Sequence, residues 1–208
     1  MIAIIDYGVG NLRSVQKSFE KVGHEALVTS DAESIAAADA VVLPGVGAFR
    51  ACMENLKEYG LVKAVYQAVE SGRPFLGICV GMQILFTECD EFGHAKGLGI
   101  FEGPVVRFPD GESAGGQVLK VPHMGWNQLT IQRSAPILAD MAEGEYVYFV
   151  HSYYPQPADP AIVSATTTYG VEFASSIWKE HIVATQFHPE KSQTVGLKII
   201  KAFGALVG

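Results

Sequence analysis

The sequence predicts an α/β protein with an open, mostly parallel, doubly wound sheet of the flavodoxin-like kind, flanked by helices. In the first half of the chain, short apolar runs alternate with amphipathic helical patterns, which is typical of βαβ units. After about Ile100, short β-rich runs separated by glycine, proline and polar turns predict a β-rich C-terminal half. With 208 residues, 49% of them hydrophobic, we expect residues 1–208 to form a single domain with a substantial core.

The elements of the first half follow from periodicity. Met1–Tyr7 is an apolar run, as expected of a strand buried in a parallel sheet. Gly8 and Gly10 turn the chain, and Asn11 is a plausible N-cap for a helix that ends at Gly23. The other elements that we expect here are strands at 25–29, 40–43 and 74–78 and helices at 49–59, 61–71 and 82–87.

The second half reads as strands closed by one helix. The expected strands lie at 105–108, 118–121, 146–150, 162–167, 173–178 and 181–186. The final helix begins near Ser192, and its apolar positions should face the core: Val195, Ile199, Phe203 and Leu206.

Composition excludes several classes of function. The formal net charge is −7 without a Lys/Arg cluster, which argues against nucleic acid and anionic membranes as partners. No apolar run reaches the roughly 18–20 residues that cross a bilayer, and the N-terminus lacks a secretion signal, so we expect a cytoplasmic protein. Cys52, Cys79 and Cys89 form no C-x-x-C pair, so neither a disulfide framework nor a metal site is predicted.

Gly77-Ile-Cys-Val-Gly81 is the most informative short stretch. It lies between a predicted strand and a helical pattern, so it resembles a cysteine version of the G-x-S-x-G nucleophile elbow. A sharp strand-to-helix turn leaves no space for side chains two residues to either side of the nucleophile. The following helix N-terminus favours a thiolate at Cys79. The alternative is a buried structural cysteine beside two turn glycines.

A nucleophilic cysteine needs a base, and the base needs an orienting group. His188-Pro-Glu190 follows the predicted strand 181–186 and supplies both. In extended backbone, residues two apart point to the same side, so Glu190 can reach one imidazole nitrogen while the other faces the thiol. Taken in isolation, a solvated loop histidine would be the simpler interpretation, and the elbow at Cys79 is what favours catalysis.

Two glycine-rich turns invite different interpretations. Pro44-Gly-Val-Gly47 follows strand 40–43 at the sheet edge where Cys79 is expected, so its N–H groups could form an oxyanion hole with the N–H of Val80. A simple turn is the alternative. Gly8-Val-Gly10 is not a dinucleotide-binding motif because Arg13 stands where the third glycine is required, so no cofactor is expected.

Together, Gly77-Ile-Cys-Val-Gly-Met-Gln83 and His188-Pro-Glu190 resemble the class I (triad) glutamine amidotransferases, over essentially the whole chain. Val80 replaces the leucine usual in that family, but only its backbone N–H is needed. Five further segments resemble the glutaminase subunits of imidazole glycerol phosphate synthases in histidine biosynthesis: 6–11, 44–47, 122–127, 148–153 and 186–192. Pro122-His-Met-Gly-Trp-Asn127 is the most specific of them.

The resemblance implies a class I glutamine amidotransferase fold and a defined chemistry. Cys79 would attack the side-chain amide of L-glutamine, with His188 as base and Glu190 orienting it, and a γ-glutamyl thioester would be hydrolysed to glutamate and ammonia. The remaining implied roles are the oxyanion hole (Val46, Gly47, Val80) and the site for the amino-acid end of glutamine (Gln83, Glu91, Ser152, Tyr153).

The resemblance also implies a partner. In that family the glutaminase forms a heterodimer with a (β/α)8-barrel cyclase and is nearly idle until the cyclase binds its nucleotide. The segments that match the family's interface contain Asn11, Trp126, Tyr148 and Lys191. We hypothesise that the 44–47 loop reorients its N–H groups on activation, since glycines lower the cost of a peptide flip.

Three alternatives stay open from the sequence. The chain could serve another pathway as a class I glutaminase, although segments 122–127 and 191–192 favour histidine biosynthesis. It could be a stand-alone cysteine hydrolase or peptidase of related fold. It could also be an idle subunit that only docks to its partner, although Cys79, His188 and Glu190 are all present.

Overall fold

The computed structural model describes residues 1–111, 113–114 and 117–207 and is built on an eight-stranded sheet in the order β11-β14-β15-β16-β4-β3-β1-β2. Five strands pair in parallel: β1 (Ile2–Ile5), β2 (Ala26–Thr29), β3 (Ala40–Gly45), β4 (Phe75–Cys79) and β16 (Ile182–Thr185). Three antiparallel strands extend this sheet beyond β16: β15 (Val171–Lys179), β14 (Val163–Tyr169) and β11 (Thr130–Ile131). Strands β1, β3, β4 and β16 are buried along their whole length and are therefore almost entirely apolar, whereas the edge strand β2 is partly exposed.

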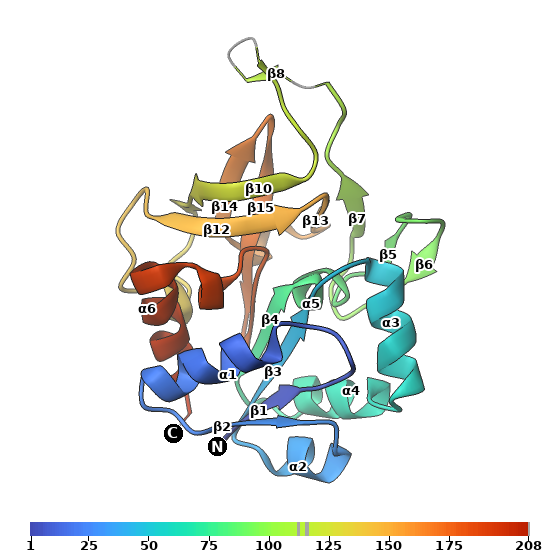
Figure 1. Ribbon diagram of the computed structural model, residues 1–208, viewed down its shortest axis with the longest axis vertical. Coiled ribbons are helices and arrows are strands. Elements are labelled where there is room, and N and C mark those ends of the chain that lie inside the picture. Colours follow the sequence, from blue (N-terminus) through green and yellow to red (C-terminus); the bar gives the residue numbers. More distant parts are fainter. Residues whose placement is uncertain (112, 115–116, 208) are drawn as a thin grey trace.

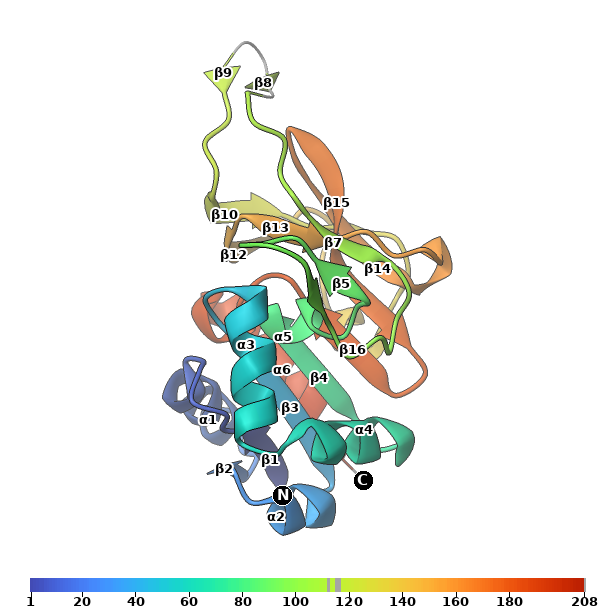
Figure 2. The same ribbon diagram turned by 90° about the vertical axis from the view of Figure 1, so that its right-hand side faces the viewer.

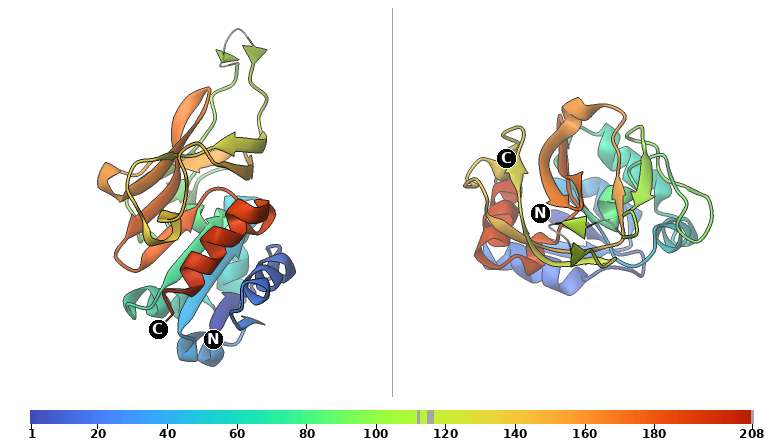
Figure 3. Two further views of the ribbon diagram at one scale, coloured as in Figure 1. Left: turned by 90° about the vertical axis from the view of Figure 1, so that its left-hand side faces the viewer. Right: turned by 90° about the horizontal axis from the view of Figure 1, so that it is seen from above.

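Helices cover both faces of the parallel strands (Figures 1, 2 and 3). On one face lie α1 (Leu12–Lys21) and α6 (Gln193–Gly204), which meet through the rings of Phe19 and Phe203, 6.0 Å apart. On the other lie α3 (Phe49–Glu58) and α4 (Val62–Glu70), with α2 (Ala32–Ala37) packed against α4. None of the described helices is long and apolar enough to span a bilayer.

A β layer lies above the carboxyl ends of the parallel strands, away from both chain termini (Figure 1). It contains the antiparallel ribbon of β10 (His123–Gln128) and β12 (Tyr146–His151). Beside the ribbon is a small sheet of β13 (Tyr153–Pro155), β7 (Pro104–Arg107), β5 (Glu88–Cys89) and β6 (Ala95–Lys96). The two-stranded β8 (Ser113–Ala114) and β9 (Gln117–Val118) project beyond it (Figure 2). The remaining elements are α5 (Val80–Gln83) and the 3-10 turns η1 (Pro136–Leu138), η2 (Pro160–Ile162) and η3 (Pro189–Lys191).

The predicted fold class is confirmed, and several local predictions are wrong. The helix expected at 82–87 is the single turn α5, which ends early because the loop at 97–101 occupies the carbonyls of residues 84–87: the N–H groups of Leu98 and Ile100 bond Ile84 and Leu85. Leu206 lies beyond α6 and is 37% exposed, so it does not face the core. Neither α2 nor β10 was anticipated, and the strand expected at 118–121 ends at Val118.

Candidate active site

Cys79 ends β4 and begins α5 with strained backbone angles, φ 56° and ψ −113°. An added Cβ at Gly81 would overlap the carbonyl oxygen of Leu43, and one at Gly77 would lie 3.1 Å from the Cβ of Ala184. The turn therefore needs glycine on both sides of the cysteine, as in other nucleophile elbows. The packing of β4 between β3 and β16 fixes the turn at the carboxyl edge of the sheet.

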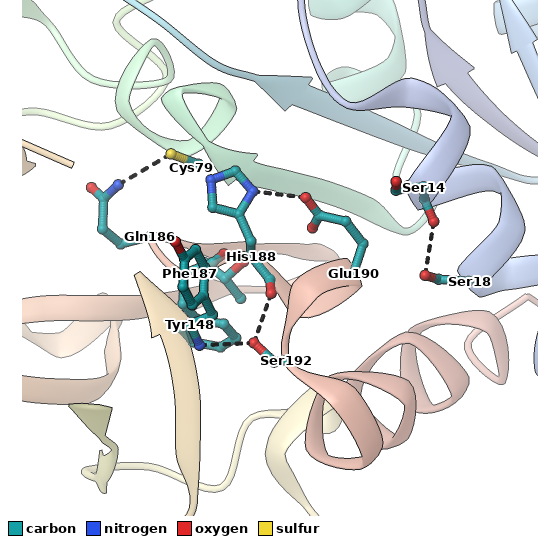
Figure 4. Close-up of polar contacts among 10 residues, drawn as sticks. Ser14, Ser18, Cys79, Tyr148, Gln186, Phe187, His188, Glu190 and Ser192 are labelled. Carbon is teal, nitrogen blue, oxygen red and sulfur yellow. Dashed lines mark hydrogen bonds and ion pairs between the residues drawn. The ribbon is translucent and has the colours of Figure 1, made fainter. Parts of the chain in front are cut away.

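His188 follows β16 and pairs with Glu190. Its Nδ1–H donates to Glu190 Oε1 across 2.7 Å, and both side chains are almost completely buried. The opposite side of the ring faces the sulfur of Cys79 (Figure 4). The backbone reaches this geometry differently from the sequence prediction: His188 is extended, but Pro189–Lys191 is the 3-10 turn η3, which curls Glu190 back to the ring.

One backbone hydrogen bond and one bridging hydroxyl hold His188 against β12. The His188 N–H donates to the Tyr148 carbonyl at 2.9 Å. The buried Ser192 hydroxyl donates to the His188 carbonyl at 2.7 Å and accepts from the Tyr148 N–H at 3.0 Å (Figure 4). The imidazole is therefore located by three elements, β16, β12 and the turn before α6.

The electrostatics favour a charged imidazole beside the cysteine. Burial by itself lowers the pKa of His188, but the neighbouring Cys79 and Glu190 outweigh it and raise that pKa to about 10. The Nε2 atom of His188 is buried and makes no hydrogen bond to any described residue, so it is available to the thiol or to a substrate. An imidazolium next to a sulfur is the setting that activates catalytic thiols.

The two other cysteines lie in different environments. Burial raises the pKa of Cys52 and of Cys89 to about 11 each, so both stay protonated at neutral pH. Neither lies at a strand-to-helix turn. Among the three free cysteines, only Cys79 has the base and the backbone geometry of a nucleophile.

A cavity of about 340 Å³ opens over Cys79. It brings together most of the residues singled out in the sequence: Val46, Gly47, Cys79, Val80, Gln83, Glu91, Ser152, Tyr153, His188 and Lys191. Asn11 does not line it, and Trp126 and Tyr148 lie on the ribbon beside it.

The four residues expected to hold the amino-acid end of glutamine line one part of this cavity. Glu91 is anchored at the start of α3, where its Oε2 accepts from the Phe49 N–H at 2.8 Å. Gln83 is buried on α5, and its amide nitrogen donates to the Tyr153 carbonyl at 2.8 Å. Ser152 and Tyr153 link β12 to β13. The carboxylate of Glu91 together with the polar side chains of Ser152 and Tyr153 suits an α-amino acid.

Tyr7 and Cys52 hold the 44–47 loop from the core side. The buried Tyr7 hydroxyl donates to the Pro44 carbonyl at 2.6 Å, and the Cys52 thiol donates to the Val46 carbonyl at 3.4 Å. In the described part of the chain, no side chain bonds to the Gly45–Val46 peptide unit that lies between them. Gly47 has a positive φ of 84° with nothing within 4 Å of an added Cβ.

The residues expected at a partner interface lie on one ribbon and at two helix starts. Trp126 and Tyr148 are cross-strand partners of β10 and β12, with ring centroids 5.9 Å apart. The ammonium of Lys191 lies 5.9 Å from the centre of the Tyr148 ring. Asn11 occupies the N-cap position of α1, but its side chain makes no capping hydrogen bond.

Three further residues of the site were not singled out by sequence. Gln186 is fully buried and reaches Cys79, Ser192 holds His188, and His151 lines the cavity. Gln186 and Ser192 belong to the same short segment as His188, so proximity to the motif was the only available signal. His151 is identified as part of the site only by the pairing of β12 with β10.

Comparisons with known proteins agree with this geometry. The family model for class-I glutamine amidotransferases matches residues 3–205. The imidazole glycerol phosphate synthase subunit HisH of Geobacter sulfurreducens is 60% identical over 205 residues, covering 99% of this chain and 98% of that protein. HisH of Syntrophotalea carbinolica is 61% identical over 204 residues, covering 98% and 99% of the two chains.

Solved structures are similar in fold. A crystal structure of a glutamine amidotransferase superposes with a TM-score of 0.74 at 20% identity and covers 100% of both chains. A chain in the structure of PurLQS from Thermotoga maritima superposes with a TM-score of 0.69 at 17% identity, covering 99% of this chain and 96% of that one. The chain belongs to the class-I glutamine amidotransferase family, and within it to the group of the HisH subunits.

Proposed function

We propose that this chain is the glutaminase subunit of an imidazole glycerol phosphate synthase, which hydrolyses L-glutamine and passes the ammonia to a cyclase subunit. The observation that supports it most directly is that Cys79 and His188 line one cavity while Glu190 bonds His188 from behind, in a chain 60% identical to a HisH subunit. This places the chain in histidine biosynthesis. Its three free thiols suit the reducing cytoplasm.

The reaction proceeds through an acyl-enzyme. The sulfur of Cys79 attacks the side-chain amide carbon of glutamine, and the proton held at His188 Nε2 moves to the departing nitrogen as the C–N bond breaks. Ammonia leaves and a γ-glutamyl thioester remains on Cys79. His188 then takes a proton from water, the hydroxide attacks the thioester, and glutamate is released while the sulfur returns as thiolate. Glu190 keeps the imidazole oriented throughout.

Backbone N–H groups stabilise the negative oxygen of each tetrahedral intermediate. Val80 follows the nucleophile, and Val46 and Gly47 approach from the end of β3. Because Tyr7 and Cys52 hold the peptide units on either side, the Gly45–Val46 unit is the one that turns when the glutaminase is activated. If partner and nucleotide left the rate of thioester formation unchanged, this switch would not exist.

The amino-acid end of glutamine is held on the other side of the cavity. The carboxylate of Glu91 binds the substrate ammonium, while Gln83, Ser152 and Tyr153 surround the α-carboxyl end. Glu91 is suited to this because one of its oxygens is fixed by the helix N-terminus and the charge of the other is available.

The partner is a (β/α)8-barrel cyclase that docks on the β10–β12 ribbon and around Asn11 and Lys191. Free ammonia would be protonated and diffuse away in water, so an interface that excludes water is needed for efficient transfer. Trp126 and Tyr148 present an aromatic surface beside the cavity, and Lys191 lines both the cavity and this surface.

The test is glutamate release from glutamine by the purified chain, alone and with the cyclase and its nucleotide ligand. We expect little activity alone, a rise of orders of magnitude with partner and ligand, and none in Cys79→Ala. Brisk turnover that ignores the partner would instead indicate a stand-alone hydrolase or a glutaminase of another pathway.

A further inference from the structure

Gln186 brings a hydrogen-bond donor to the sulfur of Cys79. Its side chain extends from the end of β16, is fully buried, and places Nε2 3.7 Å from Sγ (Figure 4). It approaches from the side of the sulfur away from Glu190, so the sulfur lies between an amide and an imidazole (Figure 4). Buried thiolates are costly unless donors face them, which makes the orientation of this amide decisive.

Neighbouring groups fix which end of the Gln186 amide faces the sulfur. The Tyr153 carbonyl accepts a hydrogen bond from Gln83 Nε2 at 2.8 Å, and a carbonyl cannot donate. Gln83 therefore presents its NH2 group, which also donates to Gln186 Oε1 at 3.1 Å. With its oxygen engaged in this way, Gln186 must turn its own NH2 toward Cys79.

Further from Cys79, the neighbouring hydrogen bonds also have donors and acceptors that are fixed by their partners. His151 Nδ1–H donates to the Tyr153 carbonyl at 2.9 Å, so its Nε2 is left to accept from His123 Nδ1 at 3.1 Å. His123 Nε2 in turn lies 3.2 Å from the Asn127 amide nitrogen on β10. Each acceptor in this series of hydrogen bonds has a donor. Reversing the Gln186 amide would place its NH2 group against the NH2 group of Gln83, so that two donors would face each other without an acceptor.

We propose that Gln186 is a catalytic residue that donates an amide N–H to the Cys79 thiolate, in an orientation set by Gln83 and the Tyr153 carbonyl. The inference rests on the proposed function and assigns one further residue to that reaction. The bond favours the anionic sulfur over the thioester sulfur, which is a weaker acceptor. Gln186 therefore stabilises both the attacking thiolate and the thiolate that leaves when water opens the thioester.

Two substitutions separate this role from packing. Gln186→Met keeps the length of the side chain and removes the donor, and Gln186→Glu places a carboxylate beside the sulfur. The readout is the pH dependence of Cys79 alkylation by iodoacetamide, followed on the Cys79 peptide by mass spectrometry so that Cys52 and Cys89 do not contribute. We expect the profile of Gln186→Met to move up by roughly one pH unit, with alkylation about tenfold slower at pH 7, and that of Gln186→Glu to move further.

Gln16→Met is the matched control. Gln16 Nε2 donates to the Ala26 carbonyl at 2.9 Å in a partly buried position between α1 and β2, so this variant loses a similar amide bond away from the site. Its alkylation profile should equal that of the parent. If Gln186→Met also keeps the alkylation profile of the parent, the proposal is wrong and Gln186 has only a packing role. If Gln186→Glu does not fold, the result for Gln186→Met alone tests the proposal. The assay needs neither glutamine nor partner, so its result is independent of the proposed function.

Discussion

At the scale of single residues, the site depends on where a side chain is forbidden as much as on where one is present. Cys79 adopts its positive φ because the strand-to-helix turn packs on the backbone of β3. Gly81 and Gly45 make this contact: a Cβ on Gly45 would lie 2.6 Å from the Gly81 nitrogen. Neither position can accept a methyl group unless β3 and β4 move apart.

Gly81→Ala should therefore destabilise the protein by about 2–3 kcal/mol or more, because the added methyl group meets the backbone of Leu43 rather than a side chain that could rotate away. Urea unfolding of the two proteins measures this. Gly99→Ala is the comparison, since Gly99 has a positive φ of 63° but open space around an added Cβ, and should cost only about 1 kcal/mol. Equal losses of unfolding free energy in Gly81→Ala and Gly99→Ala would mean that the turn at Cys79 shifts to accommodate the added methyl group.

Glu190→Gln removes one charge and changes little else in shape. Since Glu190 helps to hold the pKa of His188 at about 10, we expect that pKa to fall in the variant and kcat for glutamine to decrease on the order of 10²- to 10⁴-fold, with KM little changed. Partner-activated glutamate release and nitrogen NMR of the His188 ring are the measurements. A kcat within threefold of the parent would show that Glu190 does not act on His188.

At the scale of elements, the sequence predicts the parallel core more completely than the β layer above it. Strands such as Ile2–Ile5 are apolar on both faces, and the helices between them have clear periodicity, so their order defines the sheet. The Cys79 elbow, His188 and Glu190 follow from local motifs. The ribbon strand β10 could not be predicted in this way, because its sequence contains Gly125, a residue that is uncommon within strands, and its register depends on β12, about 20 residues later. The Gln186 amide depends on contacts from three elements, which no local pattern encodes.

The same ribbon carries a pH dependence of stability. Burial lowers the pKa of His123 to about 4 and that of His151 to about 3, so both are neutral in the folded protein at pH 7. In the unfolded chain they bind protons near pH 6.5. Stability is therefore unaffected by them above that pH and decreases as the pH falls from about 6.5 toward 4, by up to about 1.4 kcal/mol per pH unit for each imidazole.

Urea unfolding at pH 7 and at pH 5 tests this with His123→Gln. The variant should lose less stability between the two pH values than the parent does, because it has one fewer imidazole to protonate on unfolding. His94→Gln, at a side chain that is 54% exposed on the β5–β6 turn, controls for the change of residue type. If His123→Gln loses as much stability as the parent between the two pH values, His123 is not held neutral by the fold.

At the scale of the whole molecule, the outward face of the ribbon presents several exposed apolar side chains beside the cavity. Met124, Trp126 and Tyr146 are 62%, 44% and 52% exposed and lie on the same side of β10 and β12. The opposite side of these strands packs into the core through Val147 and Phe149. His123 and His151 also point inward, so the hydrogen bonds that lead to Gln186 begin directly beneath the surface proposed to bind the partner. In the proposed complex, a partner bound here would lie beside the cavity that contains Cys79, because Val150 and His151 of β12 line that cavity.

Trp126→Ala should therefore weaken binding of the cyclase subunit by at least about 2 kcal/mol, or about 30-fold in Kd, because a central aromatic side chain often carries much of the energy of an interface. Titration calorimetry gives the affinity, and glutamate release at limiting cyclase concentration should fall in proportion. Leu27→Ala is the matched control: Leu27 is a large hydrophobic residue, 39% exposed, on the edge strand β2 away from the ribbon, and its substitution should leave Kd unchanged.

At saturating cyclase, Trp126→Ala should regain most of the parent rate if the residue acts only in docking. A rate that stays low at saturation would instead mean that Trp126 also transmits activation from the ribbon to Cys79, whereas an unchanged Kd would remove the ribbon from the interface.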